Sequence, residues 1–137
     1  MQQALATVRV VVAVSPGLRR RMRAILPESE LRFVETADDL LRELDDERCD
    51  MLIVGAHFDE SSAVAALERV LARPETFPVV CVRGVHSRLG YRSMHALRLA
   101  LDELGAREFI DLLEYRDDAL GNARVRAMLE RLLLSGP

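Results

Sequence analysis

The groups that could do chemistry in this chain are few, and they follow no recognised catalytic pattern. His57, His86 and Cys81 are the best candidate metal ligands, but their spacing is not that of a zinc site. Lysine is absent, so every basic residue is an arginine. No nucleophile comes with a base and an orienting group in a known arrangement. The sequence therefore predicts a protein that is not an enzyme and that needs no metal or cofactor.

Arg83 is the polar residue of most interest because it directly follows an apolar run, Val79–Val82, that is typical of a buried strand. Together with Arg88, it can bind a phosphate, a nucleotide or a carboxylate of a partner. Two plainer interpretations stay open, which are a solvated side chain or an ion pair with Asp59 or Glu60. An anion site is thus one of three interpretations of Arg83.

Charge and hydropathy argue against several classes of function. The net charge of −3 speaks against nucleic-acid binding as the main task. The basic run Arg19–Arg21, with Arg23, lacks aromatic residues for base stacking and is interpreted as a solvated helix face. No apolar run approaches the roughly 20 residues that span a bilayer, and the N-terminus lacks the basic start of a secretion signal. The sequence predicts a cytoplasmic location, no membrane contact, and two reduced, partly buried thiols at Cys49 and Cys81.

The elements that must position these groups alternate along the chain. Apolar and β-branched runs predict five strands, at Val8–Val14, Leu31–Glu35, Met51–Val54, Val79–Val82 and Phe109–Leu113. Between and after them, apolar residues at helical spacing predict five helices. Their stripes are Leu18, Met22, Ile25 and Leu26; Leu40, Leu41 and Leu44; Val64, Leu67, Val70 and Leu71; Met94, Leu97, Leu101 and Leu104; and Leu120, Val125, Met128, Leu129, Leu132 and Leu133.

Local signals predict where three of these helices begin or end. Thr36 is placed to cap the second helix, and Asp117 or Asp118 is placed to open the last one. Gly105 is expected to end the fourth helix. We expect one domain over residues 1–134, with 135–137 as a tail or the start of a linker.

Strict alternation of strands and helices predicts an α/β fold with a doubly wound parallel sheet and helices on both faces. The flavodoxin-like strand order 2-1-3-4-5 places a functional crevice above strands one and three. In this chain, those strands end at Val14-Ser15-Pro16 and at Val54-Gly55. A glycine therefore stands where a reactive side chain is expected.

Several segments together resemble the receiver domain of two-component response regulators, the CheY-like family. They are Val10–Val14 with the turn after it, the helix Leu18–Leu26, Cys49–Val54, Phe77–Val82 and Gly105–Ile110. The last segment is similar to the family's entry into strand five. The resemblance covers nearly the whole chain and implies the flavodoxin-like (CheY-like) fold and a role in signal transduction.

The same resemblance implies five functional positions, and this chain keeps none of them. Ser15 and Pro16 match the acidic pair that holds Mg²⁺, and Gly55 matches the aspartate that accepts the phosphoryl group. Arg83 matches the Ser or Thr that senses the phosphate, and Leu112 is nearest to the lysine. Without carboxylates at these positions, the chain lacks the ligands for Mg²⁺ and the group that would form an acyl phosphate. The chain is therefore interpreted as a degenerate pseudo-receiver.

Two functions from different classes follow. The first is a non-phosphorylatable signalling module that acts through protein contacts, with an output domain or another regulator, in a two-component-like or transcription-regulating system. The second is a small flavodoxin-like domain that binds an anionic ligand near Arg83. The long segment 84–104 also suggests an enlarged contact face with Tyr91 and Leu99 on it, and we expect a homodimer.

Overall fold

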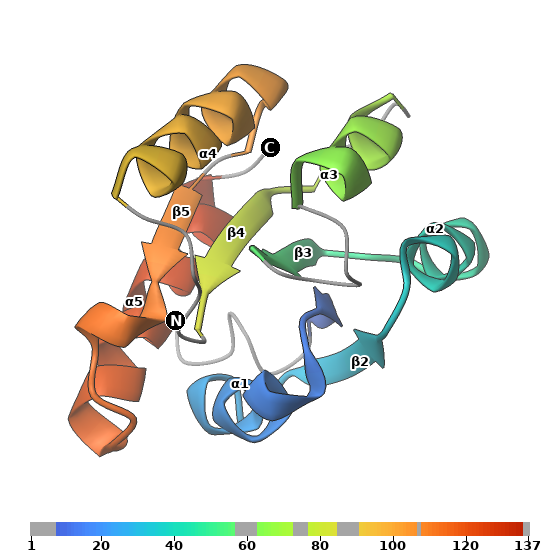
Figure 1. Cartoon of the computed structure of the whole chain (residues 1–137). Helices are drawn as coiled ribbons and strands as arrows, with labels where there is room; N and C mark the ends of the chain where they lie inside the picture. The colour runs from blue at the N-terminus through green and yellow to red at the C-terminus, as the bar shows by residue number, and fades with distance from the viewer. Residues whose placement is uncertain (1–7, 57–62, 73–76, 85–90, 107, 136–137) are drawn as a thin grey trace.

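The computed structural model describes residues 8–56, 63–72, 77–84, 91–106 and 108–135. Within them, five parallel strands form one sheet in the order β2-β1-β3-β4-β5 (Figure 1). The strands are β1 (Arg9–Ala13), β2 (Glu30–Val34), β3 (Met51–Gly55), β4 (Val79–Arg83) and β5 (Glu108–Asp111). The order confirms the predicted flavodoxin-like, doubly wound architecture.

The described residues also form five α-helices and two short 3-10 helices, which lie between the strands and after β5. They are η1 (Pro16–Leu18), α1 (Arg19–Ile25), α2 (Ala37–Asp46), α3 (Ala63–Leu71), α4 (Tyr91–Leu104), η2 (Leu112–Glu114) and α5 (Ala119–Ser135). Helices α1 and α5 cover one face of the sheet, and α2, α3 and α4 cover the other. Among the described residues, no helix combines the length and the apolar character needed to cross a membrane.

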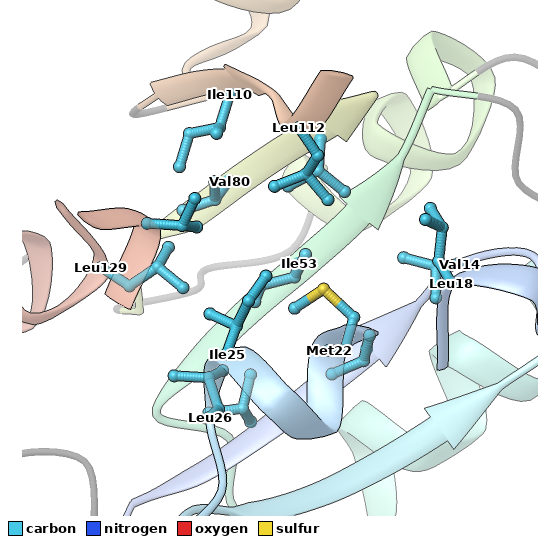
Figure 2. Close-up of a cluster of buried hydrophobic side chains, with 14 of the residues drawn as sticks. Val14, Leu18, Met22, Ile25, Leu26, Ile53, Val80, Ile110, Leu112 and Leu129 are labelled. Carbon is cyan, nitrogen blue, oxygen red and sulfur yellow. The ribbon is translucent and has the colours of Figure 1, made fainter. Parts of the chain in front are cut away.

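The three central strands are buried on both faces because alternate residues enter two separate cores. In β1, Val10 and Val12 join a core with α1 and α5, which Figure 2 shows in part. Val11 and Ala13 join the other core, with α2, α3 and α4. Every residue of β1 and β3 is buried, which explains why these strands are unbroken apolar runs in the sequence.

The predicted helix boundaries are confirmed at the level of single hydrogen bonds. Thr36 caps α2, since its hydroxyl accepts a bond of 3.0 Å from the backbone N–H of Asp39. The carboxylate of Asp118 accepts a bond of 2.8 Å from the N–H of Gly121 at the start of α5. Helix α4 ends at Leu104, and the next residue, Gly105, has a φ of 100°, in the left-handed region that favours glycine.

Three predictions about local structure are wrong. Strand β5 was expected to reach Leu113 but ends at Asp111, because the Asp111 carboxylate accepts a bond of 3.1 Å from the N–H of Leu113 and opens a 3-10 turn. Leu120 is 64% exposed because the buried side of α5 begins one residue later. Arg21 is buried and not part of a solvated face, for reasons given below.

Candidate functional site

The carboxyl ends of β1, β3 and β4 meet where the sequence places the functional crevice. The register pairs Ala13 with Val54, and Gly55 with Val82. A Cβ atom added to Gly55 would lie 3.4 Å from both the Cα and the Cγ1 atoms of Val14. The immediate neighbour of Gly55 is thus the buried Val14, which directly follows β1, while Ser15 and Pro16 lie farther along, at the start of η1.

Leu18 of η1 fills the space beside Gly84, the residue after β4. A Cβ atom on Gly84, which follows β4, would overlap the Leu18 side chain and lie 2.7 Å from its Cδ1 atom. Leu18 is only 6% exposed and belongs to the same core as Val14 (Figure 2). Over the described residues, the edge between β1 and β4 is therefore packed with aliphatic side chains.

In the described part of the chain, the donor set at this edge does not fit the magnesium ion that the receiver fold implies. Mg²⁺ takes an octahedron of oxygen ligands that normally includes a carboxylate. Gly55, Val14 and Leu18 present no side-chain oxygen, and the first hydroxyl in the chain after β1 belongs to Ser15, at the start of η1. Among the residues that the structure describes, no cluster of three or more His, Cys, Asp or Glu side chains could hold a metal ion.

Arg83 ends β4 and is held by an acidic side chain of the neighbouring strand. Its Nη1 atom donates to Oδ2 of Asp111 on β5 at 2.9 Å. The two side chains are 20% and 17% exposed, so the ion pair is largely shielded from water. The expectation of a solvated Arg83 is wrong, and Asp59 and Glu60 lie outside the described residues. Among the described residues, the buried Nε atom of Arg83 has no hydrogen-bond partner, so one donor of this side chain is unsatisfied.

Leu112, at the position nearest the family's lysine, is fully buried in the core next to α1 and α5. Its carbonyl oxygen accepts a bond of 2.8 Å from Nη1 of Arg21. Sequence analysis missed Arg21, although a signal was present. Arg21 comes three residues after Leu18 and four before Ile25, and thus lies on the apolar stripe of α1.

The predicted interface residues fall on α4, beside a cavity. Leu99 is 53% exposed and lines a cavity of about 370 Å³ between α4 and β5. The Arg98 guanidinium lies over the Phe109 ring, 5.0 Å from its centroid, at the same cavity. The side chains of Tyr91, Met94 and Leu97 lie outside the described residues, as do Arg88, His57 and His86.

Both cysteines are free, as predicted, and neither has the properties of a reactive thiol. Burial raises the pKa of Cys49 to about 11 and that of Cys81 to about 12. The thiolate is the reactive form of cysteine, so both side chains stay protonated at neutral pH.

No protein-family model matches the sequence, and no curated protein matches it. The fold, in contrast, matches solved structures of response-regulator receiver domains, the signalling modules of two-component systems.

Three of these structures illustrate the match. A putative response regulator from Chloroflexus aurantiacus is 13% identical, with 93% of this chain and 98% of that chain covered and a TM-score of 0.73. Full-length FixJ from B. japonicum is 17% identical, with 93% of this chain and 58% of that chain covered and a TM-score of 0.72. The receiver domain of sensor histidine kinase PA1611 from Pseudomonas aeruginosa PAO1, with a magnesium ion in its active-site cleft, is 12% identical, with coverages of 93% and 98% and a TM-score of 0.71.

The chain spans less than two thirds of full-length FixJ. At these identities, the likeness shows the fold that this chain shares with receiver domains and leaves its chemistry to be argued from its own residues.

Proposed function

We propose that this chain is a pseudo-receiver, a cytoplasmic signalling module that keeps the receiver fold, accepts no phosphoryl group and acts through protein contacts. The observation that carries the proposal is apolar packing at the carboxyl ends of the strands: Val14 contacts Gly55, which has no nucleophile, at the end of β3, and Leu18 fills the space beside Gly84 after β4. Phosphoryl transfer depends on positioning and on charge stabilisation by a metal and cationic groups. Over the described residues, this edge offers no metal ligands, and its cationic group, Arg83, is already paired with Asp111.

The test of this chemistry is incubation with acetyl phosphate and Mg²⁺, followed by intact mass spectrometry. We expect no gain in mass for the wild-type chain. The Gly55→Asp variant is also expected to stay unmodified, because it gains a carboxylate but no metal ligands. Its new Cβ atom would meet Val14 only at ordinary contact distance, so the variant is expected to fold. A gain of one phosphoryl group by the wild-type chain would contradict the proposal.

The proposed contact surface lies along α4 and β5. It combines an exposed leucine, Leu99, with the apolar ring of Phe109 and with charged groups from Arg98, Asp102 and Glu108 around one cavity. An apolar centre with a charged rim is the composition that protein interfaces favour. The partner would be a second copy of the chain, an output domain or another regulator in a two-component-like or transcription-regulating system.

Light scattering over a concentration series tests the homodimer. We expect the wild-type chain to dimerise and Leu99→Arg to weaken the dimer. Leu134→Arg is the matched control, because Leu134 is 66% exposed on α5, outside the cavity between α4 and β5. A monomer at every concentration would reject the homodimer, and equal effects of the two substitutions would reject this surface.

An anion-binding domain remains the second candidate because the Nε atom of Arg83 is buried and unpartnered. Calorimetry with inorganic phosphate and with nucleotides tests it, using Arg83→Met as the matched variant. Binding that is lost in the variant would support an anion site. No heat at millimolar ligand would reject it.

A further inference from the structure

Two arginines hold consecutive residues at the end of β5. Arg83 of β4 binds the carboxylate of Asp111, and Arg21 of α1 binds the carbonyl oxygen of Leu112. The two arginines reach this point from different elements of the fold. Residues 112–118, which lead from β5 into α5, are called the β5–α5 connection below.

Arg21 makes an unusually complete set of hydrogen bonds. Its Nη1 atom donates to Leu112 O at 2.8 Å, and Nη2 donates to Tyr115 O at 2.7 Å and to Arg116 O at 3.1 Å. Its Nε atom donates to Oδ1 of Asn122 at 3.1 Å. All three guanidinium nitrogens are thus bound, and Arg21 is only 8% exposed. Breaking these bonds would leave the buried Arg21 charge without its acceptors, although Leu112 O would keep the bond from the N–H of Tyr115.

Helix α5 also donates hydrogen bonds to α1. Arg126 donates from Nε to Ile25 O at 2.6 Å and from Nη2 to Ala24 O at 3.2 Å, close to the C-terminal end of α1. These two carbonyls belong to the last turn of α1, where a helix leaves acceptors free. Residues separated by about a hundred positions in sequence are therefore tied together in both directions.

Asp117 and Gly121 complete the packing of the β5–α5 connection. The Asp117 carboxylate accepts bonds from Nδ2 of Asn122 at 3.1 Å and from Nη2 of Arg20 at 2.8 Å. These bonds, with the Asn122 bond the strongest influence, lower the pKa of Asp117. A Cβ atom on Gly121 would overlap the carbonyl oxygen of Arg116. The second half of the connection, residues 115–118, is therefore in direct contact with α5.

We propose that Arg21 and Arg83 form an internal clamp that holds the end of β5 and the β5–α5 connection in one conformation. The inference deepens the proposed function and rests on it, because it says how such a module is regulated. The proposed contact surface along α4 and β5 is presented permanently and is not switched by a ligand. A two-state element needs two arrangements of similar free energy. An arrangement without the clamp would leave the buried Arg21 charge without its four acceptors, so it would be scarcely populated.

The test is NMR of the full chain, with relaxation dispersion and amide hydrogen exchange as readouts. In the wild-type chain, we expect no microsecond-to-millisecond exchange at the amides of Leu113 and Tyr115, and we expect the N–H of Tyr115, which bonds to Leu112 O at 3.1 Å, to be protected. In Arg21→Met, the exchange rates of the connection should rise by about tenfold or more relative to those of β1 and β3.

Arg20→Met is the matched control. Arg20 is adjacent on α1 and also contacts the connection through Asp117, but its side chain is 81% exposed. We expect the exchange rates of this variant to equal those of the wild-type chain. Relaxation dispersion in the wild-type connection would overturn the clamp by itself, even if Arg21→Met failed to fold. A uniform rise in exchange throughout Arg21→Met would also overturn it, because that result indicates general destabilisation.

These outcomes are separable from those that test the proposed function. A chain that takes up a phosphoryl group but keeps a rigid connection would refute the pseudo-receiver and keep the clamp. A chain that takes up none but shows exchange in the connection would do the reverse.

Discussion

Replacement of Glu43 by glutamine should strongly destabilise the fold at a point far from the candidate site. Glu43 forms an ion pair with Arg9 at the start of β1, and the two side chains are 12% and 10% exposed. Arg9 also donates to Arg48 O at 2.7 Å and contacts Oε2 of Glu30 at 3.1 Å. Glu43 in turn accepts a bond of 3.0 Å from Arg32. Glu43 is the buried acidic partner of Arg9, since the Glu30 side chain is 69% exposed.

The expected loss follows from the burial of this ion pair. Removal of one partner from a buried ion pair costs roughly 3–5 kcal/mol, because the other charge remains buried without compensation. Glu30 and the Arg48 carbonyl still contact Arg9, which places Glu43→Gln near the lower end, at about 3 kcal/mol. With an unfolding entropy of about 2.1 cal/mol/K per residue, this corresponds to a fall in Tm of roughly 10 °C for the 137-residue chain.

Thermal unfolding followed by circular dichroism measures the effect, with urea unfolding as a second readout. Glu35→Gln is the matched control, because Glu35 pairs with Arg19 at 2.8 Å but is 63% exposed. An exposed pair of this kind contributes at most about 1 kcal/mol, so Glu35→Gln should lower Tm by no more than about 3 °C.

A double substitution separates charge from packing. In Arg9→Met with Glu43→Leu, no charge is left buried, and the double variant should be more stable than Glu43→Gln alone. The reasoning is refuted if Glu43→Gln melts within about 2 °C of the wild-type chain. It is also refuted if the double variant is the least stable of the three.

Three further predictions concern pH, packing and thiol reactivity. Hydrogen bonding to Arg9 lowers the pKa of Glu43 in the folded chain, so the contribution of Glu43 to the free energy of unfolding is complete above its unfolded pKa of about 4.3 and is lost as pH falls further. Urea unfolding from pH 7 to 3 should therefore show a steeper fall in the free energy of unfolding for the wild-type chain than for Glu43→Gln. Gly121→Ala should lower Tm because the new methyl group overlaps Arg116 O, whereas Gly17→Ala, with nothing within 4 Å of its Cβ position, should not. Cys81, with a pKa of about 12, should resist iodoacetamide at pH 8 until urea unfolds the chain, and rapid labelling of the native chain would contradict its burial.

Most of the fold was predictable because its signals are local. A strand buried on both faces must be an apolar run, as Met51–Val54 is, and an amphipathic helix must repeat its apolar residues at helical spacing. The caps at Thr36 and Gly105 were also predictable, because each depends on a residue type within one turn of the helix. The same reliance on local patterns explains the wrong boundary of β5. The apolar run that includes Leu112 and Leu113 is typical of a strand and does not reveal that Asp111 caps a 3-10 turn.

The sequence by itself determined the alternation of strands and helices and the absence of a carboxylate at Gly55, because both are properties of residues in order along the chain. Only the tertiary structure decided that Leu18 fills the edge between β1 and β4, that Asp111 is the partner of Arg83, and that Arg21 is buried. The contacts of Arg21 join residues 91 to 101 positions apart. No local pattern encodes such contacts, since they exist only once the crossovers of the parallel sheet bring α1 beside the end of β5.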